Sequence, residues 1–376
     1  MSAKILFVYH YVALYREPVF CELVASDDME VWVASDVVSN NDIRLVSKES
    51  PIYHSNRFLP LFNAWFKNRV LWQGGVVRAL FSKRWDAVVF LGDPNFLTTW
   101  IGLFLLRFTK CKPYLWTHGF VMRGGVLQRR LKMLMYGLSD GVFLYGNNSR
   151  KELEALGVSP SKLHVIYNSL DYSAQKSFRE YWDARDVVEC RSRFFSEPVD
   201  FLLIFVGRLT FHKKLVMCLD AMAKLAMDDV KVNLLFVGDG EAREELEGAV
   251  GRLGLSGRVC FYGSCHEERE LARLFHCSDV CVAPGEIGLT TMHALAYGVP
   301  CITHSNDMKQ MPEFEAVISG RTGELFEDGN VEDLARAILT VKHRTKNFYS
   351  KDCIDVIEKF YTPEQQALRF REVLNG

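Results

Sequence analysis

The chain has 376 residues, of which 49% are hydrophobic and 24% are charged, and its formal net charge at pH 7 is −1. This composition is typical of a globular protein, and a net charge so close to zero excludes a general attraction to nucleic acid. The length exceeds that of one ordinary hydrophobic core and predicts two domains.

Several features of the sequence predict a cytoplasmic protein. The ten cysteines form no C-x2-C pair, and several lie inside strand-like runs, as buried and reduced thiols do. We expect no signal peptide, because the strand-like segment KILFVYH follows the first three residues directly. The longest apolar run, residues 96–108, is too short to cross a bilayer.

The first half alternates strand-like and helix-like segments. Strands are predicted at 5–10, 30–34, 87–91, 113–116, 141–145 and 163–167, and helices between them include 64–85 and 126–138. Such alternation predicts a parallel sheet with helices on both faces. Residues 1–170 are therefore expected to form a first, Rossmann-like domain.

Two segments of this half place polar side chains at strand ends, where open α/β sheets bind ligands. His118 follows the strand at 113–116, and a His-Gly pair there is either a plain turn or a ligand contact. The segment HYVALYREPVF begins at His10 and includes Arg16 near a helix start. An arginine in that place either binds an anionic ligand or caps a loop.

The predicted helix at 64–85 is rich in aromatic and basic side chains. They are Trp65, Phe66, Trp72 and Phe81 with Lys67, Arg69, Arg78, Lys83 and Arg84. Together with Arg129, Arg130 and Lys132 they predict contact with an anionic membrane surface. The alternative is a helix with one core face and one solvated face.

Residues 171–198 are polar and charged, without a buried-strand pattern, and are expected to connect the first domain to a second at 199–360. In that second half, four apolar runs end in glycine turns. The first run ends at Gly207-Arg208 with Lys213 five residues later, and the others end at Gly238-Asp239-Gly240, Gly263 and Gly285. Two cations at the carboxyl end of a parallel strand lie where such sheets bind ligands.

The segment APGEIGLTTMHALAYGVPCITH, residues 283–304, predicts a strand end, a glycine turn, a helix at 289–297 and another strand. The backbone N–H groups of Gly288, Leu289 and Thr290 would lie unpaired at the start of that helix. This arrangement binds anions, diphosphates most commonly, although a turn followed by a helix is also ordinary α/β architecture.

These motifs, in this order, resemble the nucleotide-binding half of GT-B glycosyltransferases, specifically the retaining family 4 (glycosyl transferases group 1) of polysaccharide biosynthesis. Its members carry G-R-L-x-x-x-K, V-G-x-G, F-x-G and E-x7-E blocks, which correspond here to 207–213, 237–240, 261–263 and 285–293. The resemblance is strong in the second half and weaker in the first. It implies two doubly wound Rossmann-like domains with a cleft between them, and a C-terminal helix, 361–376, that packs back on the acceptor-side first domain.

The resemblance also implies roles for individual residues. The nucleotide-sugar donor would be bound by Gly207, Gly240, Tyr262, Gly263, Gly288, Leu289, Thr290 and His293. Arg208 and Lys213 would neutralise the leaving diphosphate, so that neither a metal nor another cofactor is expected. His118 would contact the donor sugar, and His10 and Arg16 the acceptor.

One motif departs from the family pattern. The two family glutamates fall at positions 285 and 293, where this chain has Gly285 and His293, while Glu286 lies one residue late. His293 could still bond a ribose hydroxyl through a ring nitrogen, or could simply pack. Glu286 could replace the first glutamate as a catalytic group if the turn is re-routed.

The sequence thus predicts a metal-independent, retaining hexosyltransferase that moves a sugar from a nucleotide-diphosphate sugar to a glycan or lipid-linked acceptor of surface polysaccharide biosynthesis. We expect it in the cytoplasm, peripheral to the inner face of the cell membrane. Two alternatives stay open: a non-hydrolysing UDP-sugar 2-epimerase of the same fold, and a non-catalytic protein that binds nucleotide sugars.

Overall fold

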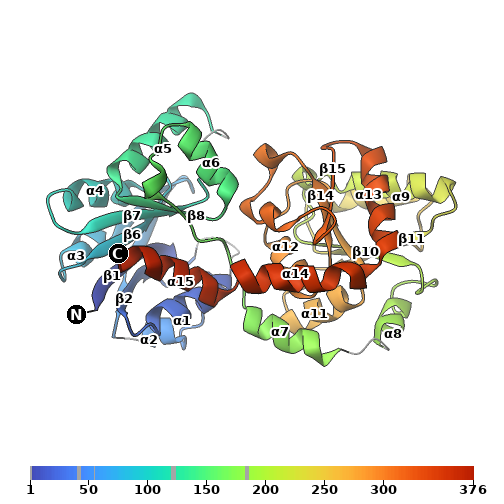
Figure 1. Cartoon of the computed structure of the whole chain (residues 1–376), viewed down its shortest axis with the longest axis horizontal. Helices are drawn as coiled ribbons and strands as arrows, with labels where there is room; N and C mark the ends of the chain where they lie inside the picture. The colour runs from blue at the N-terminus through green and yellow to red at the C-terminus, as the bar shows by residue number, and fades with distance from the viewer. Residues whose placement is uncertain (1, 40–43, 55, 120–123, 183–185) are drawn as a thin grey trace. The chain divides into compact units, whose positions relative to one another are not determined.

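The computed structural model describes residues 2–39, 44–54, 56–119, 124–182 and 186–376. The chain divides into two compact units, which are coloured along the chain in Figure 1. Unit 1 comprises residues 1–170 and 362–376, and unit 2 comprises residues 171–361.

Unit 1 is built on a parallel seven-stranded sheet in the order β3-β2-β1-β6-β7-β8-β9. The strands are β1 (Ala3–Tyr11), β2 (Met29–Asp36), β3 (Phe58–Pro60), β6 (Ala87–Leu91), β7 (Lys112–Thr117), β8 (Gly141–Leu144) and β9 (Leu163–Val165). Continuous apolar runs form the central strands because both faces are covered: Ile5, Leu6 and Phe7 are all fully buried. The six strands predicted for this half are confirmed, and β3 is an addition.

Helices cover both faces of this sheet. They are α1 (Glu17–Val24), α2 (Pro51–His54), α3 (Val76–Leu80), α4 (Leu97–Leu106), α5 (Val126–Leu138), α6 (Asn147–Ala155) and α15 (Pro363–Leu374). Helices α1 and α15 share one core cluster with β1, whereas α3, α4 and α5 share the other. The last helix returns to unit 1, where the Phe370 ring lies 5.5 Å from that of Phe7 and 5.0 Å from that of Trp116.

The helix predicted at 64–85 is wrong. Residues of this segment form an antiparallel hairpin, β4 (Phe62–Phe66) and β5 (Val70–Gly74), followed by the short α3. Lys67 and Asn68 form its turn with φ of 49° and 52°, which gives the twist that a tight hairpin needs. The alternating polar residues Asn63 and Gln73 point inward, and their side-chain amides donate to the backbone oxygens of His10 and Tyr9.

Unit 2 is built on a parallel six-stranded sheet in the order β12-β11-β10-β13-β14-β15. The strands are β10 (Phe201–Val206), β11 (Val232–Val237), β12 (Val259–Gly263), β13 (Val280–Ala283), β14 (Cys301–His304) and β15 (Gly323–Phe326). Its helices are α7 (Tyr172–Tyr181), α8 (Asp186–Ser192), α9 (Val216–Met227), α10 (Arg243–Arg252), α11 (Glu268–His276), α12 (Leu289–Ala296), α13 (Val331–Arg344) and α14 (Lys346–Phe360). Each unit is thus a doubly wound, Rossmann-like α/β fold, as predicted.

The expected connector 171–198 is not a separate linker, since it forms α7 and α8 and belongs to unit 2. Arg179 donates to the backbone oxygen of Ala296 at 2.6 Å, and Arg191 pairs with Asp279 at 2.8 Å. The polar residues whose composition suggested a linker therefore include arginines that contact the rest of unit 2.

Candidate functional site

The order of strands in unit 2 reverses between β10 and β13, which makes the ends of these strands the topological switch point of the sheet. From β10 the chain proceeds outward to β11 and β12, and from β13 it proceeds the other way to β14 and β15. Ligands of open α/β sheets bind outside the carboxyl ends of the strands at this point. Arg208 and Lys213 follow β10, and Glu286 and Gly288 follow β13, so four predicted site residues belong to the two loops that flank the switch point.

Glycines allow the loops after β10 and β11 to cross in direct backbone contact. Gly207 N donates to Val237 O at 2.9 Å, and Leu209 N donates to Asp239 O at 3.0 Å. A Cβ atom at position 238 would lie 1.9 Å from Gly207 O, and one at 240 would lie 2.4 Å from Leu209 O. Gly207 and Gly240 thus shape the site, since φ is 145° and 157° at these two positions, values that side chains rarely allow.

Lys213 and Glu286 meet across the switch point. The Lys213 ammonium donates to the backbone oxygen of Glu286 at 2.8 Å, and its Nζ lies 3.7 Å from Glu286 Oε1. Burial lowers the pKa of Lys213 below its ordinary value, while the Glu286 carboxylate opposes that shift. The backbones are also joined, because Gly285 N donates to Lys213 O at 2.9 Å.

Arg208, in contrast, is exposed. Within the described ranges no carboxylate lies within ion-pair distance of it, so its charge faces solvent at the end of β10. Lys214, next to Lys213, has φ of 50° and points to Asp328, with which it forms an ion pair at 2.5 Å. The two neighbouring lysines therefore serve different purposes, and only Lys213 contacts the loop after β13.

Helix α12 begins directly after this loop, with Gly288 as its N-cap residue. No described residue accepts a hydrogen bond from the backbone N–H of Gly288, Leu289 or Thr290. The Thr290 hydroxyl donates to Val206 O at 2.8 Å and fixes the start of α12 against the end of β10. Three N–H groups at a helix start, next to Lys213, form an anion-binding arrangement.

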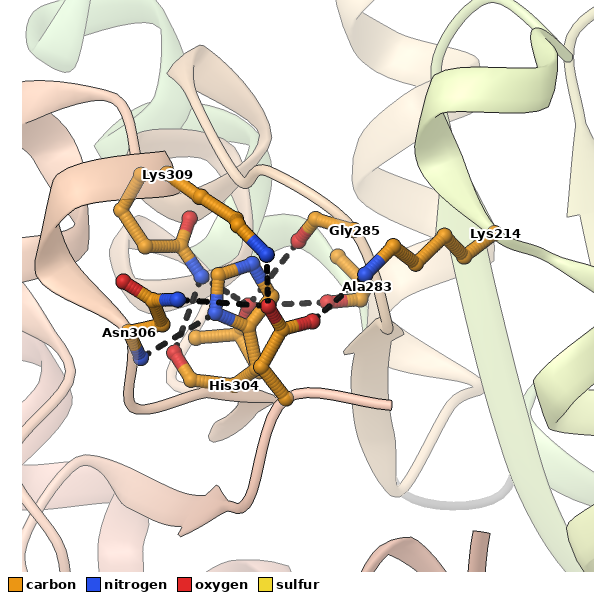
Figure 2. A network of polar contacts seen from close by, with 9 residues as sticks. Lys214, Ala283, Gly285, His304, Asn306 and Lys309 are labelled. Atoms are coloured by element: carbon orange, nitrogen blue, oxygen red, sulfur yellow. Dashed lines mark hydrogen bonds and ion pairs between the residues drawn. The ribbon is translucent and has the colours of Figure 1, made fainter. Parts of the chain in front are cut away.

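A buried polar network, which no sequence pattern indicated, holds the loop of residues 284–288 in place. Ile287 N donates to Gln310 Oε1 at 2.8 Å, and Gln310 Nε2 donates to Thr303 Oγ1 at 2.9 Å and to His304 O at 3.0 Å. The Thr303 hydroxyl donates to Ala283 O at 2.8 Å (Figure 2). Gln310 and Thr303 are almost fully buried, so these bonds are shielded from water.

Asp328, in the loop after β15, anchors the outer side of this network. Besides Lys214 it accepts hydrogen bonds from Lys309 Nζ at 2.8 Å and from Asn306 Nδ2 at 3.3 Å (Figure 2). The hydrogen bonds from Lys214 and Lys309 hold the pKa of Asp328 well below its ordinary value. Its charge therefore orients two lysines at the edge of the site.

His293 lies on α12, and among the described residues only its Nδ1 has polar partners. Its Nδ1 lies 3.2 Å from Gln175 Nε2 and 3.3 Å from Glu268 Oε1, and its ring stacks on Phe275. Burial raises the pKa of Glu268, but hydrogen bonds, chiefly from His293, outweigh that effect and leave this pKa below its ordinary value. The chain thus keeps a carboxylate beside position 293, although the family's glutamate is absent there.

Tyr262 and Gly263 lie at the end of β12. The Tyr262 hydroxyl donates to Glu270 Oε1 at 2.7 Å, and burial raises its pKa to about 12. Gly263 has φ of 89°, and its backbone oxygen accepts from Gly238 N at 2.8 Å. The glycine therefore continues the contact between the strand-end loops, and the tyrosine hydroxyl is engaged within unit 2.

The other predicted residues belong to unit 1. His118 is exposed, its backbone oxygen accepts from Ser149 Oγ at 2.7 Å, and its ring lies 4.8 Å from that of Tyr145. Arg16 is only 3% exposed and donates to Asn168 Oδ1 and, at 2.6 Å, to Tyr145 OH. Burial, together with the charge of Arg16, lowers the pKa of His10 to about 4. Arg16 is therefore not a surface arginine that caps a loop, which was the alternative to its predicted acceptor contact, because its guanidinium is engaged inside unit 1.

The described residues contain no cluster of three or more His, Cys, Asp or Glu side chains that could hold a metal ion. In the same residues no helix is both long and apolar enough to span a membrane.

Comparison with known protein families gives a match that lies within unit 2. Residues 191–353 match the family described as Glycosyl transferases group 1, so the chain contains a domain of that family.

The sulfoquinovosyl transferase SQD2 of Arabidopsis thaliana is 30% identical over 44% of this chain and 31% of its own length. The N-acetyl-alpha-D-glucosaminyl L-malate synthase of Bacillus anthracis is 28% identical over 61% of this chain and 58% of its own. The matched stretch thus spans less than two thirds of either curated relative. Among solved structures, Anabaena HepE in complex with UDP and glucose aligns over 100% of both chains, with a TM-score of 0.71 at 18% identity. Its likeness confirms the GT-B fold.

Proposed function

We propose that the protein is a retaining, metal-independent glycosyltransferase of family 4 that transfers a hexose from a nucleotide-diphosphate sugar to a glycan or lipid-linked acceptor. The observation that carries this proposal is that Lys213, Arg208 and the start of α12 follow the two strands that flank the switch point of unit 2. The family match over residues 191–353 supports it. The presence of UDP and glucose in the structure of HepE supports the donor class.

The chemistry follows from charge. In glycosyl transfer the bond between the anomeric carbon and the diphosphate oxygen breaks, and the diphosphate leaves with the electron pair. The acceptor hydroxyl forms the new bond at that carbon and gives up its proton to an oxygen of the departing diphosphate. Negative charge therefore grows on the diphosphate, and the helix start, Lys213 and Arg208 stabilise it. These groups supply the positive charge that a metal ion supplies in other sites.

The remaining roles are predictions. We expect His293 Nε2 to bond a ribose hydroxyl, because Nδ1 is already engaged as the donor to Glu268. Glu286 would orient the donor sugar, with its backbone held by Lys213. His118 would contact that sugar as well. An acceptor role for His10 is still expected, whereas Arg16 would act only indirectly, by holding the first loop. We expect the reaction in the cytoplasm, at the inner face of the membrane.

Two measurements test the proposal. Thermal unfolding with UDP, GDP, ADP and CMP should give a stabilisation with one nucleoside diphosphate, because a ligand that binds only the folded state raises its stability. Turnover of the matching nucleotide sugars then identifies the reaction. Transfer or slow hydrolysis with release of the diphosphate supports a glycosyltransferase. Interconversion of the sugar would instead establish an epimerase, and binding without any turnover would establish a non-catalytic protein.

A further inference from the structure

Unit 1 contains a stretch of chain without negative charge. Residues 94–139 include seven Lys or Arg and no Asp or Glu, although the whole chain has 45 basic and 46 acidic residues. This stretch contains α4 and α5, two helices that contact each other on the same face of the unit 1 sheet (Figure 1). Three of these cations, Arg129, Arg130 and Lys132, lie on α5, while Arg107 is the C-cap residue of α4 and Lys110 follows it.

The same two helices expose large apolar side chains. On α4 and just after it these are Leu97, Phe104 and Phe108, exposed by 41%, 59% and 77%, and on α5 they are Leu127, Leu131 and Leu134, exposed by 72%, 37% and 57%. The exposed positions are spaced by seven and four residues along and just after α4, and by four and three residues along α5, so each set forms a stripe. The opposite sides of these helices already supply Leu103 and Met135 to the core, so packing within unit 1 does not account for the exposed stripes.

Exposed cations accompany the stripes. Arg107 is the C-cap residue of α4, Lys110 follows three residues later, and Arg130 lies on α5 between Leu127 and Leu131. In the described part of the chain no carboxylate lies within ion-pair distance of these three cations. The surface thus offers bulky apolar groups for burial, and positive charges that this unit does not neutralise.

We propose that the outer face of α4 and α5, defined by these six apolar residues and three cations, binds the surface of an anionic lipid bilayer. The apolar side chains enter the boundary between headgroups and acyl chains, and the cations face lipid phosphates. All charges of this surface are positive and lie among Leu and Phe side chains, which complements an anionic bilayer, and residues 94–139 contribute no acidic side chain that would oppose this contact. This surface replaces the expected helix at 64–85 as the membrane-binding element, and it does not rest on the proposed activity.

The test is sedimentation of the full chain with vesicles of phosphatidylcholine and phosphatidylglycerol, and with vesicles of phosphatidylcholine alone. We expect binding to the anionic vesicles that weakens as salt is added. The double variant Phe104→Ser with Phe108→Ser, and separately Arg130→Glu, should each lower the partition coefficient about tenfold or more. Phe348→Ser, which alters a side chain of unit 2 that is 56% exposed, and Arg252→Glu, at an exposed cation of α10, are the matched controls and should bind like the wild type.

Circular dichroism and nucleotide binding by unit 2 should be unchanged in all variants, which separates this proposal from the proposed activity. Equal binding to both kinds of vesicle, no binding by the wild type, or unaltered binding by the two surface variants would overturn it. Self-association that disappears in these variants, without vesicle binding, would assign the face to a protein partner instead.

Discussion

Replacement of His293 by glutamate tests how this chain compensates for its missing family glutamate. Comparison of sequences alone predicts that His293→Glu retains or restores nucleotide affinity, because a carboxylate can accept hydrogen bonds from both ribose hydroxyls. The structure predicts the opposite, because Glu268 Oε1 lies 3.3 Å from His293 Nδ1. A second carboxylate at position 293 would face that of Glu268, and both side chains are largely buried.

The magnitude follows from the distance. Two carboxylates about 4 Å apart repel by roughly 4 kcal/mol at an effective dielectric constant of about 20, and one of them will take up a proton instead of bearing this cost. His293→Ala removes only one neutral hydrogen bond, which corresponds to about 1 kcal/mol or roughly fivefold in Kd. We therefore expect His293→Glu to bind the nucleoside diphosphate more weakly than His293→Ala at pH 8, and to recover affinity at pH 5.

The assay is calorimetric titration with the preferred nucleoside diphosphate and its 2′- and 3′-deoxy analogues. The double variant His293→Glu with Glu268→Gln should restore the affinity that His293→Glu loses, because only one carboxylate then remains. Glu268→Gln alone serves as the control and should have a small effect, since an amide oxygen can still accept from His293. Full affinity in His293→Glu alone would refute the coupling, and unchanged affinity in His293→Ala, for ribose and deoxyribose alike, would make His293 a packing residue.

Three further outcomes follow from single contacts. Asp328→Asn should destabilise the protein at pH 7, because Lys214 loses its ion pair. Folding lowers the pKa of Asp328, so the stability that this carboxylate contributes is present above its unfolded pKa of 3.8 and is lost as pH falls through the folded pKa. Urea unfolding should therefore show that the stability difference between variant and wild type shrinks near pH 3. A stability difference equal at both pH values would contradict this. Gly238→Ala should lower the yield of folded protein, because its Cβ would lie 1.9 Å from Gly207 O, and normal melting would show that these loops do not cross as described. His118→Ala should impair turnover much more than nucleotide binding in steady-state kinetics and titration, and equal losses would remove it from the sugar-binding role.

The fold was largely predictable because strands that are buried on both faces of a sheet have continuous apolar sequences. Such runs identified β1 and β10 without any knowledge of their neighbours. The hairpin at β4 and β5 escaped because its aromatic residues suit a helix or a strand, and its turn uses Lys67 and Asn68 instead of glycine. Local patterning could not decide between the two, since the deciding contacts are made with distant strands.

The candidate site was predictable where topology alone determines it. Arg208, Lys213 and Gly288 follow strands that flank the switch point, so their proximity required no knowledge of side-chain packing. The contacts between elements were not predictable. Gln310 and Glu268 reach the site from other parts of unit 2, and their partners depend on how those elements pack. The same holds for Arg16, whose burial depends on partners that lie far away in the sequence.

Calorimetric titration of nucleoside diphosphates into the wild type, Lys213→Ala and Arg208→Ala tests the central claim most directly, namely that the switch point of unit 2 binds the diphosphate of the donor. We predict that one nucleoside diphosphate binds the wild type and that each variant binds it about tenfold more weakly or worse, because a charge-assisted contact to phosphate is lost. The corresponding nucleoside should bind all three proteins alike, because the base and ribose contacts remain. Arg208→Ala should leave folding unaffected because Arg208 is exposed, and thermal unfolding of Lys213→Ala serves as its folding control because that variant also loses the hydrogen bond to Glu286 O. Equal diphosphate affinity in all three proteins would contradict the claim.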